Sequence, residues 1–220
     1  MVSTSNKAGL LGFFYGGSRA ALGRARNRVV QLLSDRRGVA AIEFAFVAPL
    51  LLMTYLASME ISLAIEASKK VSRAASMVAD LIAQQPTMSK AEIEAIMAIG
   101  GSLLQPYNRS GLTITVTAIA IGNESTPQVK VAWSRMLEKG EPKAGVAAGT
   151  ATTVPEKLKI AGSFLVKVES VLEYKPVIAW SDSQKASLGL VAAIGEMTMK
   201  DTYHLRPRMS QTIPCGDCYN

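Results

Sequence analysis

The stretch that decides the fold is GVAAIEFAFVAPLLLMTYLASME, residues 38–60. Its only charged residues are Glu43 and Glu60, and the run from Phe44 to Met59 carries no charge. With the apolar residues on either side, the run reaches about 20 residues, the length at which an α-helix can cross a bilayer. A carboxylate inside such a helix costs about 2.5–3.5 kcal/mol even on lenient insertion scales, so Glu43 predicts a functional role.

The chain has 220 residues and a net charge of +7, and this charge is concentrated at its beginning. Residues 1–38 hold seven of the 24 basic residues and one of the 17 acidic residues, so the remainder is nearly neutral. A basic segment before a membrane span predicts a cytoplasmic flank. A nucleic-acid-binding arm is the competing interpretation. We favour the flank and expect no nucleic acid partner, because an apolar span follows directly.

The helical pattern continues well beyond the apolar run. Apolar residues recur at spacings of three and four as far as Ile82, and the segment Gln84-Gln85-Pro86 predicts the end of the helix. A cleaved secretory signal fits this pattern poorly, because the leader is long and the helix continues past the run. A helix from about residue 40 to 84 would be roughly 65–70 Å long, so only its first half can lie in the bilayer.

The rest of the chain predicts one more helix and an antiparallel sheet. Ser89 and Glu92 have the spacing of a capping box that begins a second helix. Alternating apolar residues predict about four strands, near residues 112–117, 129–133, 164–174 and 195–206. We expect a long exposed loop over residues 138–155, a helical turn from Pro155 to Leu158, and an excursion over residues 176–194. The predicted fold class is α+β, with the long helix packed on one face of the sheet.

The residues around Gly38 have the pattern of a prepilin processing site. Arg36 and Arg37 precede the glycine, four apolar residues follow it, and Glu43 is the fifth residue after it. Together with the residues that follow, this segment resembles a TadE-like (TadE/TadG) pseudopilin of the tight-adherence (Tad, or Flp) type IV pilus assembly system. The resemblance rests on residues 37–52, 59–61, 69–71, 78–84 and 202–210, and on Cys215.

The resemblance implies a pilin-like fold and a minor pilin-like protein that assists pilus assembly. A prepilin peptidase would cleave between Gly38 and Val39, and Glu43 would then offset the new α-amino group on a neighbouring subunit. A charge in an apolar bundle needs such a partner. The implied partners are this peptidase, other pilin-like proteins, the Tad secretion platform and membrane lipid. The chain is much longer than the major pilins of this system, which favours a pseudopilin over a filament subunit.

The implied organisation has four parts. A basic cytoplasmic leader covers residues 1–38 and a single transmembrane helix of the bacterial inner membrane covers residues 39–65. A periplasmic α+β domain covers residues 66–214, including the helix continuation to about residue 84, and a cysteine-containing tail covers residues 215–220.

Each membrane-edge carboxylate has an alternative interpretation. Without the glycine and the basic leader, Glu43 would be explained as a carboxylate near a helix N-terminus, stabilised by the macrodipole. We expect Glu60 to lie at the outer membrane interface, where a charge costs little, with contact to the secretion platform as the alternative.

Cys215 and Cys218 form a C-x-x-C motif within the last six residues. In a thioredoxin fold this motif opens a helix after a strand, a context that is missing here. Two cysteines in an oxidising periplasm favour a structural disulfide. His204 is the only histidine, so we expect no metal site. The sequence has no glycine-rich phosphate loop, serine elbow or paired carboxylate site at a plausible spacing, so we expect neither a cofactor nor catalytic activity. The alternatives from other classes are an unprocessed, signal-anchored periplasmic binding domain and a thiol-redox enzyme.

Overall fold

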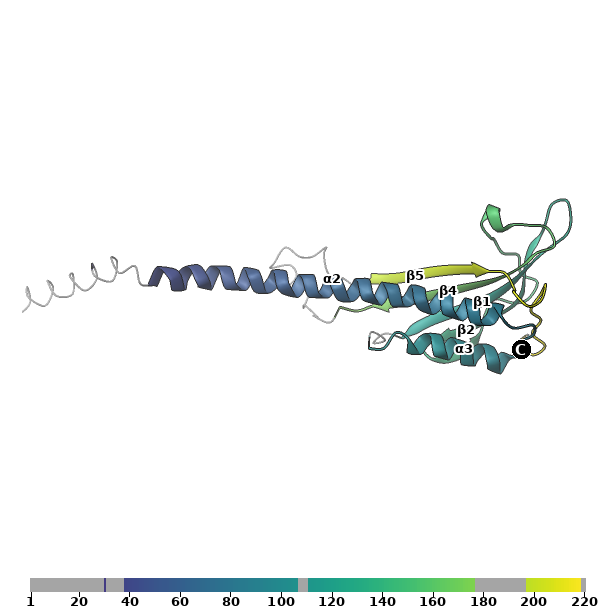
Figure 1. Cartoon of the computed structure of the whole chain (residues 1–220), viewed down its shortest axis with the longest axis horizontal. Coiled ribbons are helices and arrows are strands. Elements are labelled where there is room, and N and C mark those ends of the chain that lie inside the picture. The colour runs from purple at the N-terminus through teal and green to yellow at the C-terminus, as the bar shows by residue number, and fades with distance from the viewer. Residues whose placement is uncertain (1–29, 31–37, 107–110, 177–196, 219–220) are drawn as a thin grey trace, which may run out of the picture. The chain divides into compact units, whose positions relative to one another are not determined.

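The computed structural model describes residue 30 and residues 38–106, 111–176 and 197–218 (Figure 1). The chain divides into two compact units, Met1–Leu56 and Ala57–Asn220. The predicted basic leader lies outside the described residues except for Val30 and Gly38. The excursion expected over residues 176–194 also lies outside them, apart from its first residue.

Helix α2, Val39–Ala83, begins in the first unit and contains Pro49. Its most apolar 18-residue window has a mean hydropathy of 2.0, and none of that window is buried. Exposed side chains in this part include Phe44, Phe46 and Leu50. By length and composition, α2 is therefore long and apolar enough to cross a membrane.

In the second unit, the rest of α2 supplies one wall of the core. Its small and β-branched residues allow the helix backbone to lie close to the sheet. The fully buried residues are Ala67, Val71, Ala74, Ala75, Val78, Ala79, Ile82 and Ala83. Ile61 begins the predicted apolar stripe but is 61% exposed, so the covered stripe starts about two turns later than its first residue.

Helix α3, Lys90–Ser102, follows as the second helix and begins at the predicted capping box. The Ser89 hydroxyl accepts a hydrogen bond from the Glu92 backbone, and the Ser89 backbone donates to the Glu92 carboxylate over 2.8 Å. Ile93 and Met97 are completely buried against the sheet. Gly100 lies so close to Val78 that an added Cβ would be 2.5 Å from its methyl group. The glycine therefore permits α3 to pack on α2.

The sheet is antiparallel and has the strand order β3-β2-β1-β4-β5. Four strands match the predicted ones, and a short 3-10 helix, Glu156–Leu158, lies at the predicted helical turn. The strands are β1 (Leu112–Ile121), β2 (Val129–Glu138), β3 (Glu141–Ala144), β4 (Phe164–Tyr174) and β5 (Met197–Leu205). The α+β prediction is confirmed, with five strands rather than about four.

Strand β3 lies in the segment that we expected to be a loop. Its four residues, EPKA, are all exposed and show no apolar alternation. Backbone pairing with β2 forms the strand, and the turn that joins the two uses positive φ angles at Lys139 and Gly140. The Lys143 ammonium also donates to the Glu138 carboxylate. Because these contacts are cross-strand ones, no periodic pattern could have revealed the strand.

The main core lies between the two helices and one face of the sheet (Figure 1). Alternate residues of β1 and β4 face it, among them Ile114, Val116, Val166 and Val168. The register of β1 on β2 shifts between Ala118 and Ile119. Beyond this irregularity a small second cluster forms, made of Ile119, Ile121 and Leu165 with Val129, Val154 and Leu158 packed against it.

Candidate functional site

The predicted processing site lies at the start of α2 and is accessible. Gly38 directly precedes the helix, and both Gly38 and Val39 are exposed. A Cβ added at Gly38 would meet no heavy atom within 4 Å. A larger residue at this position therefore tests recognition by a peptidase without disturbing the fold.

Glu43 lies one helical turn after Val39 and is also exposed. The first turn of α2 contains no acidic residue, so Glu43 stands beyond the region where the macrodipole acts strongly. This position weakens the macrodipole explanation. A carboxylate here faces the surroundings of an apolar helix and needs a positive partner from elsewhere.

The structure corrects the exposed environment that we expected for Glu60 at the membrane interface. Its side chain is only 4% exposed, and the hydroxyl of Tyr174 donates a hydrogen bond of 2.7 Å to its Oε1 atom. Tyr174 is the last residue of β4 and is itself buried, so the end of this strand covers the turn of α2 that carries Glu60. The carboxylate is therefore held by the domain rather than exposed at the interface.

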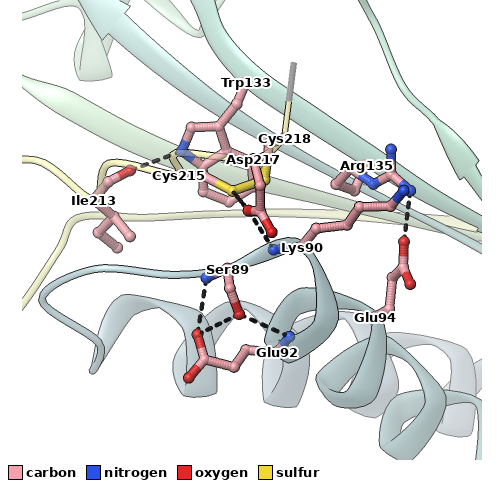
Figure 2. Close-up of a disulfide and its surroundings, with 10 residues drawn as sticks. All are labelled: Ser89, Lys90, Glu92, Glu94, Trp133, Arg135, Ile213, Cys215, Asp217 and Cys218. Carbon is pink, nitrogen blue, oxygen red and sulfur yellow. Dashed lines mark hydrogen bonds and ion pairs between the residues drawn. A yellow bond between two sulfur atoms is a disulfide. The ribbon is translucent and has the colours of Figure 1, made fainter. Parts of the chain in front are cut away.

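A second cluster of contacts forms around residues 206–218, which we call the C-terminal clasp. The clasp touches α2, where the Arg208 backbone donates to Ala83 and its guanidinium lies 2.5 Å from Asp80. It touches the sheet, where the indole of Trp133 donates to the carbonyl of Ile213 over 2.7 Å (Figure 2). The clasp thus joins segments that are far apart in the sequence.

The clasp ends at the start of α3 (Figure 2). Cys215 and Cys218 form a disulfide, with Cα atoms 5.6 Å apart, and Cys215 pairs with Met88 in an isolated bridge. Within the four-residue loop, Asp217 accepts a hydrogen bond of 2.8 Å from the Lys90 backbone. A carboxylate at a helix N-terminus is favoured by the helix dipole, so the loop acts as a second cap on α3.

The burial and bonding of the two cysteines are relevant to two alternative roles, a thiol-redox enzyme and a metal site. Cys215 and Cys218 are 1% and 6% exposed, and they follow an irregular segment rather than opening a helix. A redox-active pair needs an accessible sulfur. Among the described residues, Cys215, Asp217 and Cys218 form the one group with metal-ligand spacing, and in the disulfide neither sulfur is a thiolate.

The face of the sheet away from the helices carries charged residues on β4 and β5. Glu169 lies 2.8 Å from Lys167 and 3.2 Å from Lys200. Burial tends to raise the pKa of Glu169, but these two lysines lower it below its usual value. His204 stands opposite Lys167 in the strand register. Burial, followed by the charge of Lys167, lowers the pKa of His204 below 6.5.

Comparison with known proteins finds a family resemblance at the start of α2. Residues 38–80 match the family model TadE, described as TadE-like protein. This segment resembles a TadE-like protein. The match begins at Gly38, includes Glu43 and Glu60, and is consistent with a TadE-like protein of the Tad pilus system. Neither the curated proteins nor the solved structures give a match.

The sequence located the TadE-like segment and both cysteines, but it missed two contacts that hold the domain together. Nothing in the sequence indicates Tyr174 as the partner of Glu60, 114 residues away. Asp217 lies between the cysteines, and no local signal placed it near Lys90, 127 residues away. Such contacts depend on chain topology rather than on local patterns.

Proposed function

We propose that this protein is a membrane-anchored pseudopilin that assists Tad pilus assembly after a prepilin peptidase removes residues 1–38. The observation that carries the proposal is the TadE-like match that begins at Gly38, at the start of an exposed apolar helix. The basic leader favours a cytoplasmic N-terminus. The second unit would then lie in the periplasm, and the membrane would be the bacterial inner membrane.

The chemistry of the proposed cleavage explains the carboxylate. Hydrolysis of the Gly38–Val39 amide bond leaves a carboxylate on Gly38 and a free α-amino group on Val39. In the apolar surroundings of a pilin bundle, this positive charge and Glu43 of a neighbouring subunit stabilise one another, because each would otherwise be desolvated alone. Processing would therefore supply a positive partner for Glu43 of a neighbouring subunit.

In this proposal the domain acts through protein contacts. The cysteine pair is buried, and its loop caps α3. We assign this disulfide a structural role in the periplasm, where oxidation is favoured. The partners would be the peptidase, other pilin-like proteins and the Tad secretion platform.

Complementation of a Tad-piliated strain that lacks this gene tests the role. The wild-type chain should restore surface pili, whereas Glu43→Ala should not, although the variant remains in the membrane fraction. Glu66→Ala is the matched control, because Glu66 is an exposed carboxylate on the same helix outside the uncharged run. Normal piliation of the strain without the gene would contradict the proposed role.

A further inference from the structure

The apolar surface of α2 continues past Glu60 into the second unit. Ile61 is 61% exposed and Ile65 is 51% exposed, although both belong to the unit that holds the core. Because residues four apart share one side of a helix, these two side chains lie together. Glu60 points about 100° or more away from them around the helix axis, toward Tyr174.

The position of these residues along the helix matches the edge of a bilayer. At 1.5 Å per residue from Val39, a hydrocarbon core of about 30 Å ends between Ser58 and Glu60. The headgroup layer extends about 5–8 Å further, which covers Ile61 and reaches Ile65 when the helix is moderately tilted. The two isoleucines therefore stand where an apolar side chain can still contact lipid.

The charged side chains near Glu60 are also compatible with a membrane boundary at this part of α2. Glu60 lies at the edge of the hydrocarbon core, where a charge becomes costly. Its carboxylate is buried and accepts a hydrogen bond from the Tyr174 hydroxyl, so it is not exposed to lipid. Lys69 follows Ile65 by one turn on nearly the same side and is exposed, so its ammonium can reach lipid phosphates. Glu66 points to another side of the helix and lies 4.0 Å from Lys70.

We propose that the two turns of α2 after Glu60 are seated in the lipid headgroup layer, with Ile61 and Ile65 against lipid and Lys69 at the phosphates. The pair formed by Glu60 and Tyr174 permits this seating, because it keeps a carboxylate out of the lipid-facing surface. This inference rests on the membrane anchor of the proposed function. It adds that the second unit meets the bilayer directly.

Spin labels on the full chain test this seating in nanodiscs of phosphatidylethanolamine and phosphatidylglycerol, with one chain per disc. Nitroxides at Ile61→Cys and Ile65→Cys should collide more often with oxygen, which concentrates in lipid, than with a water-soluble nickel chelate. Arg73→Cys, about 12 Å beyond Ile65, should show the reverse order. The unsubstituted chain, labelled without reductant, gives the background from Cys215 and Cys218.

A label at Leu50→Cys, within the uncharged run of α2, separates this proposal from the anchor itself. Lipid-like collisions at Leu50 with water-like collisions at Ile61 and Ile65 would overturn the seating alone. Water-like collisions at Leu50 would overturn the anchor as well. Low collision rates with both reagents at Ile61 and Ile65 would show that protein covers them, which also overturns the proposal.

Discussion

Removing the Tyr174 hydroxyl should destabilise the domain through Glu60. Both side chains are 4% exposed and their hydrogen bond is 2.7 Å long, so water cannot easily replace the lost donor. A hydrogen bond to a charged group contributes about 1.5–3 kcal/mol, and we expect Tyr174→Phe to lower the free energy of unfolding by about that amount. Urea unfolding of the full chain in detergent, followed by near-ultraviolet circular dichroism, measures this change.

Tyr203→Phe provides the matched control, because it removes a tyrosine hydroxyl that contacts the neutral hydroxyl of Ser72 over 3.2 Å at a partly buried site. Its cost should be smaller, about 0.5–1.5 kcal/mol. In a Glu60→Met background, Tyr174→Phe should cost less than in the wild-type chain, because the hydrogen bond between Tyr174 and Glu60 is already absent there. Equal costs of Tyr174→Phe with and without Glu60 would refute the reasoning.

Three further predictions concern the domain. Ser89→Ala should cost about 1 kcal/mol by removing the side-chain cap of α3. The backbone hydrogen bond of residue 89, followed by that of the Ser89 side chain, holds the pKa of Glu92 below 4.5, so in an NMR titration this pKa should rise in the variant but stay below 4.5, because the alanine keeps the backbone donor. Cys218→Ser should lower the free energy of unfolding by about 2 kcal/mol, as the chain-entropy estimate for so short a loop suggests, and reductant should have no further effect on this variant. Because burial and Lys167 lower the folded-state pKa of His204, the unfolded chain binds the extra proton more readily, so stability should fall as pH drops through 6.5 and on toward the lowered value. His204→Gln should flatten that part of the pH profile, and an unchanged profile would contradict this assignment.

Local patterns in the sequence predicted most of the secondary structure. The capping box at Ser89 gave the start of α3, because a cap is formed by residues three apart. Alternating side chains predicted β1 and β4, because burial alternates along the first half of β1 and along most of β4. The long helix ended within one residue of the predicted break at Gln84.

The features that the sequence missed depend on contacts between distant segments. Strand β3 has no buried face, so its residues carry no alternation, and pairing with β2 alone defines it. Glu60 was placed at the interface because its neighbours are apolar, whereas its burial depends on where β4 ends. The C-terminal clasp joins Arg208 to Asp80 and Ile213 to Trp133, pairs that only the folded topology brings together.

The mature N-terminus tests the central claim most directly. The full chain should be expressed together with a prepilin peptidase of a Tad system, purified from membranes and measured by intact mass spectrometry and N-terminal sequencing. We predict a chain that has lost residues 1–38 and begins at Val39, while Gly38→Val stays at full length. A Cβ added at Gly38 meets no heavy atom of the described residues within 4 Å, so the block would reflect recognition by the peptidase. A full-length wild-type chain, in cells that process another prepilin, would contradict the account.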